Sequence, residues 1–154
     1  MYSPDEVAGI VDVFGVLTHE QAERALSELA YRHGGKDITP EAVIENAIEA
    51  FALVEFDDDG DRLIAPGPAA FPELPEGGED LPYILEVNDR SIDRSTLERA
   101  ATERLRSETD QVVVDDDGER AAELLEVSYD IETWGGADLS SVRDRLETVT
   151  DDTN

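Results

Sequence analysis

The spacing of apolar residues changes abruptly near Phe51, and this change limits the folds that the chain can adopt. Before it, apolar residues recur three and four positions apart, which is typical of amphipathic helices. After it, two short β-compatible runs, LVEF (53–56) and RLIA (62–65), flank the Asp-rich segment DDDGD. An Asp- and Gly-containing link between such runs predicts a β-hairpin. We therefore expect the chain to begin with helices and to continue into a hairpin.

Three helix-start signals precede the predicted hairpin. SPDE (3–6) and THEQ (18–21) each place a Ser or Thr cap three residues before Glu or Gln, which is the pattern of a capping box. TPEA (39–42) places Pro directly after a candidate Thr cap, and Pro suits the first position of a helix. Three helices are thus predicted, and glycines at positions 15 and 34–35 end the first two.

The remainder of the chain predicts a strap followed by a second helical region. Residues 67–92 are rich in Pro and Gly and are interpreted as a strap, with a short strand in YILEV (83–87). Phe71, Leu74 and Leu81 are expected to pin this strap to the first domain. Residues 93–150 predict a helical hairpin and a short final helix, and residues 151–154 a frayed tail. The run VVV (112–114) suits either a helix end or a strand. The predicted class is mainly α with a small β-hairpin, and the first domain spans residues 1–66.

The segment DDDG occurs twice, and its letters can be tested against a calcium-binding loop. With Gly60 at the invariant sixth position, the twelfth position is Pro66, where the loop needs a bidentate Glu. With Gly118 at the sixth position, the twelfth is Leu124. Both segments are therefore interpreted as turns, and no metal site is predicted.

The charge balance indicates the salt concentration to which the chain is adapted. Asp and Glu number 39 against 12 basic residues, Lys36 is the only lysine, and the net charge is −27. Such a chain repels itself in dilute buffer, whereas in 1 M salt the Debye length is only about 3 Å. The balance resembles that of haloarchaeal proteins, which work in concentrated monovalent cations. With no cysteine, no basic flank before an apolar stretch and no membrane-length apolar run, we expect a cytoplasmic protein without membrane association.

Catalytic signatures are not visible in the sequence. The two histidines, His19 and His33, have no metal-ligand spacing, and the motifs GxSxG, GxxxxGK[ST] and GxGxxG are absent. Carboxylate pairs carry little information in a chain this acidic. We predict no catalytic residue and no cofactor, and an enzyme of unknown class stays as an unsupported third hypothesis.

The order and lengths of the elements over residues 4–66 resemble a winged-helix domain. The resemblance implies that the second and third helices form a helix-turn-helix, joined by RHGGKD (32–37), with DDDGD as the wing tip. The chain as a whole resembles the small uncharacterised haloarchaeal families, and this likeness implies no activity.

In winged-helix proteins that bind DNA, the third helix enters the major groove. Here its outer face is expected to carry Glu41, Glu45 and Glu49, an acidic row that would repel phosphates. We therefore predict a non-catalytic regulatory or interaction protein that binds a protein partner or its own copy through this face. The alternative is a DNA-binding transcription regulator, and its expected nucleic-acid contacts are Arg32, Lys36 and Arg62.

Overall fold

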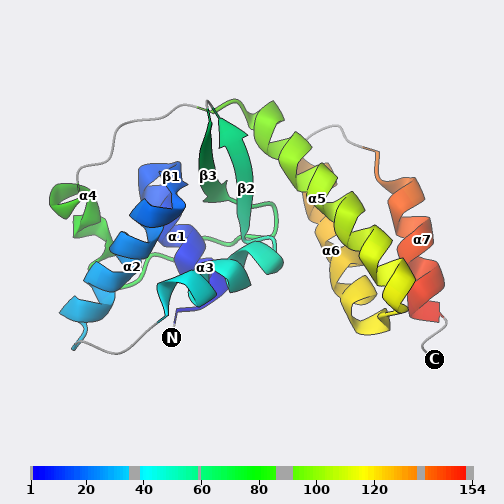
Figure 1. Ribbon diagram of the computed structural model, residues 1–154, viewed down its shortest axis with the longest axis horizontal. Coiled ribbons are helices and arrows are strands. Elements are labelled where there is room, and N and C mark those ends of the chain that lie inside the picture. The colour runs from blue at the N-terminus through cyan, green and yellow to red at the C-terminus, as the bar shows by residue number, and fades with distance from the viewer. Residues whose placement is uncertain (1, 35–38, 59, 86–91, 135–137, 152–154) are drawn as a thin grey trace. The chain divides into compact units, whose positions relative to one another are not determined.

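The computed structural model describes residues 2–34, 39–58, 60–85, 92–134 and 138–151. The chain divides into two compact units, Met1–Asp93 and Arg94–Asn154. The first unit combines helices with a small antiparallel sheet, and the second is helical over its described residues (Figure 1). The mainly α class with a small β-hairpin is therefore confirmed.

Over its described residues, the first unit holds eight elements. In chain order they are α1 (Pro4–Phe14), β1 (Leu17–Thr18), α2 (His19–Arg32), α3 (Pro40–Glu49), β2 (Leu53–Asp58), β3 (Asp61–Pro66), the 3₁₀ turn η1 (Gly78–Asp80) and α4 (Leu81–Ile84). The sheet has the order β1-β3-β2, and both strand pairs are antiparallel. The hairpin is the predicted one. The short strand β1, in which Leu17 pairs with Ile64, was not predicted.

Local side-chain hydrogen bonds begin the first two helices as predicted. The Ser3 hydroxyl accepts from the Glu6 backbone N–H, and the Glu6 carboxylate accepts from the Ser3 N–H. Thr18 and Gln21 make the same reciprocal pair at the start of α2. Thr39 is the residue before α3, but its side chain makes no capping hydrogen bond.

The core of the first unit lies between the sheet and the three helices α1, α2 and α3. Each helix contributes one apolar face, as the spacing predicted, and the strands close the core from the other side. The buried cluster also includes Leu81 of α4, which lies within the strap. Its members are Val7, Ala8, Ile10, Val11, Leu17, Ala22, Ala25, Leu26, Leu29, Val43, Ile44, Ala47, Ile48, Ala52, Leu53, Ile64 and Leu81.

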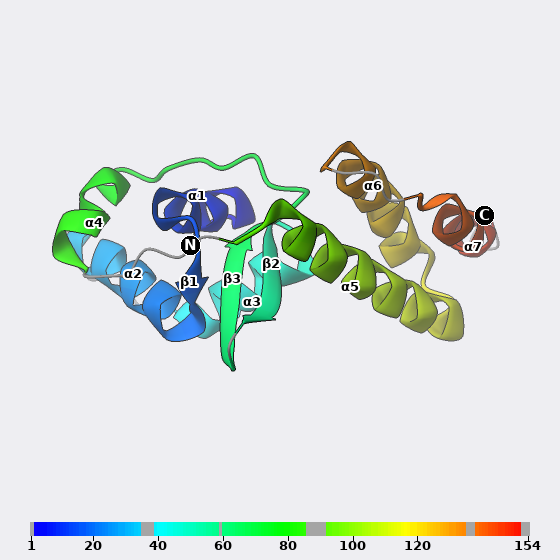
Figure 2. The same ribbon diagram turned by 90° about the horizontal axis from the view of Figure 1, so that it is seen from above.

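The beginning of the strap is attached to α1. The Glu73 N–H donates to the Asp5 carbonyl oxygen over 3.0 Å, and the Phe71 N–H donates to the Asp5 Oδ1 atom over 3.1 Å. Figure 2 shows this segment running along α1 toward α4. A Cβ atom added at Gly9 would lie 2.2 Å from the Glu73 carbonyl oxygen. Only glycine therefore allows this close approach of the two backbones.

The strap differs from expectation at two places. Leu81 is buried, but Phe71 is 78% exposed and Leu74 is 43% exposed, so of these three side chains Leu81 alone fastens the strap. The expected strand at 83–87 is wrong over its first two residues, because Leu81–Ile84 form the short helix α4 with Pro82 in its first turn. Residues 86–91 lie outside the described residues.

The second unit contains α5 (Arg94–Asp115), α6 (Gly118–Trp134) and α7 (Ser140–Asp151). The guanidinium of Arg94, at the start of α5, lies 4.6 Å from the ring centroid of Trp134 at the end of α6, so these two helices run antiparallel. The ambiguous run 112–114 is helical, because α5 continues to Asp115. The buried apolar side chains are Ala101, Leu105, Val112, Ala121, Leu124, Val127, Ile131, Leu139, Val142, Leu146 and Val149.

Candidate functional site

The acidic face predicted on α3 is present as an exposed surface. Glu41, Glu45 and Glu49 are all exposed, while the apolar side of the helix is buried. This division follows from the helical period, because residues four apart lie on the same side. We call these three glutamates the α3 acidic face.

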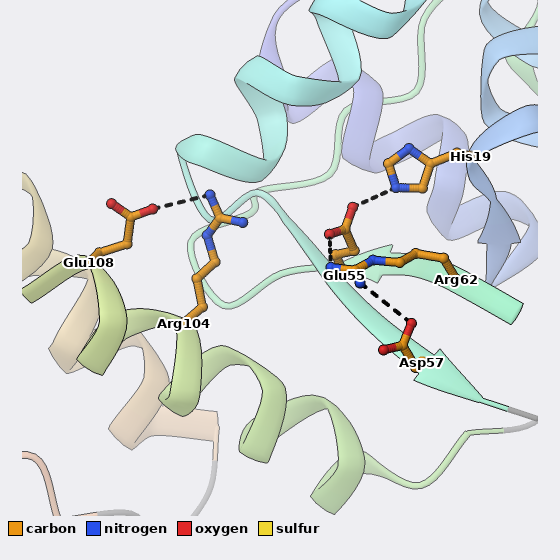
Figure 3. A network of polar contacts seen from close by, with 6 residues as sticks. All are labelled: His19, Glu55, Asp57, Arg62, Arg104 and Glu108. Atoms are coloured by element: carbon orange, nitrogen blue, oxygen red, sulfur yellow. Dashed lines mark hydrogen bonds and ion pairs between the residues drawn. The ribbon is translucent and has the colours of Figure 1, made fainter. Parts of the chain in front are cut away.

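Arg62, predicted as a nucleic-acid contact in the alternative, belongs to a network on the sheet (Figure 3). Its guanidinium donates to Glu55, and its Nη1 atom lies 3.6 Å from the Asp57 Oδ1 atom. Glu55 also contacts His19, with 2.6 Å between His19 Nε2 and Glu55 Oε2. One carboxylate on β2 thus joins β3 to the first residue of α2.

The network fixes the charge on Glu55. Partial burial would raise the pKa of Glu55, but hydrogen bonds from Arg62 and His19 outweigh this effect and hold its pKa below the ordinary value. The hydrogen bond to Glu55 in turn raises the pKa of Arg62. No local sequence pattern indicates this cluster, since His19 and Glu55 are 36 positions apart. The cluster joins β2, β3 and α2, because Arg62 is already bound to the carboxylates of Glu55 and Asp57.

The other predicted nucleic-acid contacts are at the end of α2. Arg32 Nε lies 3.5 Å from Glu28 Oε1, and Arg32 Nη1 lies 3.8 Å from Asp80 Oδ2 in η1. The neighbouring His33 Nδ1 atom lies 3.3 Å from the Tyr2 hydroxyl. Lys36 lies outside the described residues. Both described arginines of this set are therefore already paired with carboxylates of their own unit.

Arginine–carboxylate contacts also join the three helices of the second unit. Glu108 of α5 forms an ion pair with Arg104 (Figure 3), at a distance of 3.4 Å, and it also lies 3.8 Å from Arg120 of α6. Arg145 of α7 lies 2.7 Å from Asp110 of α5. Two of these contacts therefore join α5 to α6 and to α7, and the third lies within α5.

A further arginine, Arg143, makes a polar contact between α7 and α6. Arg143 lies 2.7 Å from Glu132 of α6, and its guanidinium stacks 4.6 Å from the Tyr129 ring centroid. Hydrogen bonds from Arg143 and from the Leu139 backbone lower the pKa of Glu132. Arginine contacts thus join the helices of the second unit in addition to their buried apolar side chains.

In the part of the chain that the structure describes, no group of three or more His, Asp or Glu side chains is arranged to hold a metal ion. Within those residues, none of the helices has both the length and the apolar character that a bilayer span requires.

Comparison with protein families decides where the chain belongs. A family model described as a family of unknown function, DUF7109, matches residues 5–151. The chain belongs to this family. The match runs through both units, so the family comprises the sheet-containing unit and the helical unit together. Comparison with curated proteins and comparison with solved structures each gave no match.

Proposed function

We propose that this DUF7109 member is a salt-adapted cytoplasmic regulatory protein whose first unit is a winged-helix-like domain used to bind protein. The element order α1-β1-α2-α3-β2-β3 with the sheet order β1-β3-β2 supports the winged-helix assignment. The fold alone does not specify a ligand, so the function is argued from the surface.

The α3 acidic face carries the proposal. In a winged-helix domain α3 is the helix placed for recognition, and here it presents exposed carboxylates instead of cations. Phosphates would meet like charge on this face, whereas a basic protein surface would meet opposite charge. The commitment of Arg32 and Arg62 to carboxylates further weakens the DNA-binding alternative.

The test is affinity purification from native high-salt cytosol with a charge-reversed face. Glu41→Lys with Glu45→Lys should abolish retention of a partner protein that the wild type retains. The matched control is Asp144→Lys with Glu147→Lys, which changes the charge equally at two exposed positions of α7. Circular dichroism at the same salt should show that both variants remain folded.

The DNA-binding alternative makes the opposite prediction at other residues. If Lys36→Glu with Arg62→Glu abolishes a sequence-specific shift of duplex DNA at native salt, the protein-binding proposal is wrong. Retention that is unchanged by reversal of Glu41 and Glu45 would equally contradict a role for the α3 acidic face.

A further inference from the structure

Phe71 of the strap differs from the other phenylalanines of the chain in its exposure. Its side chain is 78% exposed, whereas the other three phenylalanines are buried or half-buried. Pro72 beside it is also exposed, and Leu74 is 43% exposed. An aromatic side chain in water forgoes the free energy that its burial would give. The first unit therefore leaves an apolar segment of the strap uncovered.

The backbone that carries Phe71 is held in place. The Phe71 N–H donates to Asp5 Oδ1 over 3.1 Å, and the Glu73 N–H donates to the Asp5 carbonyl oxygen over 3.0 Å. Further along the strap, Pro75 is buried, and its carbonyl oxygen accepts from the Gly78 N–H over 2.9 Å. A segment that is fixed before binding loses little conformational freedom when a partner binds. The strap therefore presents Phe71 as a preformed contact.

The charged residues of this part of the strap are all acidic. Residues 67–85 contain no Lys or Arg, and their carboxylates belong to Glu73, Glu76, Glu79 and Asp80. The three glutamates are exposed, and Asp80 is paired with Arg32 of α2. An apolar contact bordered by carboxylates is complementary to an apolar groove bordered by Lys or Arg. The same border would repel the phosphates of a nucleic acid or of an anionic lipid.

We propose that Phe71 anchors a partner protein whose surface has an apolar groove bordered by basic side chains. The residues of this surface are not those of the α3 acidic face, so the inference goes beyond the proposed function. In concentrated salt, screening weakens the attraction between charges, whereas the burial of an aromatic side chain is not screened. Phe71 therefore supplies an attraction that persists at molar salt.

Peptide binding to the purified full chain tests the inference. The probe is a synthetic helical peptide with a stripe of leucines flanked by arginines, and its control carries glutamates in place of the arginines. Fluorescence anisotropy of the labelled peptides in molar potassium chloride measures binding. The wild type should bind the arginine peptide and not the glutamate peptide. Phe71→Ser should weaken this binding about tenfold or more, because it removes a buried aromatic contact.

Tyr31→Ser is the matched control, because Tyr31 of α2 is 77% exposed. The side of α2 toward the strap is that of Leu29, whose Cδ2 atom lies 3.7 Å from the position of a Cβ atom added at Gly77. Residues two apart on a helix do not share a side, so Tyr31 faces away from this part of the strap. Tyr31→Ser should leave peptide binding unchanged, and circular dichroism checks the folding of both variants. Equal losses in the two variants, or no binding of the arginine peptide, would overturn the inference.

A second background separates this inference from the proposed function. In Glu41→Lys with Glu45→Lys, binding of the arginine peptide that depends on Phe71 should persist. If that reversal abolishes all peptide binding, the strap site is wrong and the role of the α3 acidic face stands. If the strap site persists while the reversal leaves partner retention unchanged, the inference stands and the proposed function fails. Sedimentation velocity completes the test, since self-association that depends on Phe71 would identify a second copy as the occupant and overturn the inference.

Discussion

The two DDDG segments have the same letters and form different structures. In the first unit, the segment joins β2 to β3, Asp58 pairs with Asp61, and Gly60 has a positive φ of 84°. In the second unit, the segment joins α5 to α6, and the residue with positive φ is Asp116, at 53°. Gly118 there is the first residue of α6.

The difference comes from the residues on either side. Before Asp57 the apolar residues of β2 are buried by long-range packing, whereas before Asp115 a 22-residue helix is already formed. Asp117 then accepts a hydrogen bond from the Arg120 N–H, as a helix N-terminus requires. The structure of a DDDG segment is therefore decided by the residues that flank it. Changes at the two segments can be used to compare the two units.

Of the changes considered, a change in salt concentration should have the largest effect on stability, and it should affect both units. Each turn gathers aspartates in a chain of net charge −27, so lowering potassium chloride from molar to dilute concentrations should destabilise both units. Thermal melts across a salt series, followed by circular dichroism, measure this dependence. A melting temperature that stays flat or falls with added salt would contradict it.

Removing a buried side chain beside the first turn should be costly. Leu63 of β3 is fully buried and pairs with Phe56 across the hairpin, so Leu63→Ala should cost about 2–5 kcal/mol of unfolding free energy. The control beside the second turn is Val114→Ala, because Val114 is 79% exposed and its loss should change stability by less than about 0.5 kcal/mol. Denaturant unfolding in molar salt gives both values, and equal losses would refute the comparison.

Substituting the residue with positive φ in each turn should change stability in opposite directions. Gly60→Ala places a side chain in the left-handed region and should cost about 1 kcal/mol. Asp116→Gly relieves that conformation in the second turn and should stabilise by a few tenths of a kcal/mol. The measurement is again denaturant unfolding. Two changes of the same sign would show that backbone strain is not what separates the turns.

The pH dependence of the two units should have opposite signs at two carboxylates. The pKa of Glu55 is lowered, so its contribution to stability is present above about pH 4.3, the unfolded value, and is lost as pH falls through the folded pKa. Burial, and then the charge of Glu126, raises the pKa of Asp130 in α6. Ionised Asp130 therefore destabilises, and stability falls as pH rises from about 3.9 through the folded pKa.

Two neutral substitutions test these signs. Glu55→Gln should lower the melting temperature at pH 7 and flatten the loss of stability in acid. Asp130→Asn should raise the melting temperature at pH 7 and have no effect well below pH 3.9. Thermal melts between pH 3 and pH 7 at constant salt measure both effects. An increase in melting temperature for Glu55→Gln at pH 7 would contradict a stabilising role for ionised Glu55.

Calcium should have the smallest effect, close to none at either turn. Neither segment supplies the twelfth-position Glu of a calcium loop, so millimolar calcium should not raise the melting temperature above that in potassium alone. Asp57→Asn and Asp116→Asn serve as one matched variant for each turn. A rise specific to calcium and removed by either substitution would identify a metal site there.

Local sequence patterns predicted the helix starts well, because their causes are local. Ser3 with Glu6, and Thr18 with Gln21, need only residues within one turn, and both capping boxes form. The strand β1 depends on the pairing of Leu17 with Ile64, 47 positions away, so two residues gave no recognisable strand pattern. In the strap, apolar type alone did not distinguish buried Leu81 from exposed Phe71.

The exposure of the candidate site residues could be predicted from the sequence, but their ion pairs could not. Helical periodicity was enough to place Glu41, Glu45 and Glu49 on one exposed face. Arg62 carries no sequence mark of its contact with Glu55, because that contact arises only when β2 and β3 pair. Whether a cation is available to a ligand is decided by tertiary neighbours, which single-residue patterns do not contain.

The close approach of the strap to α1 restricts how this protein can diverge. Position 9 lies inside a helix, where drift would ordinarily replace glycine by alanine and gain helix stability. The carbonyl oxygen of Glu73 stands where the new methyl group would go, so the replacement is blocked for as long as the strap keeps its path. Descendants can change position 9 only together with the strap, and the two segments should be gained, altered or lost as a single inherited unit.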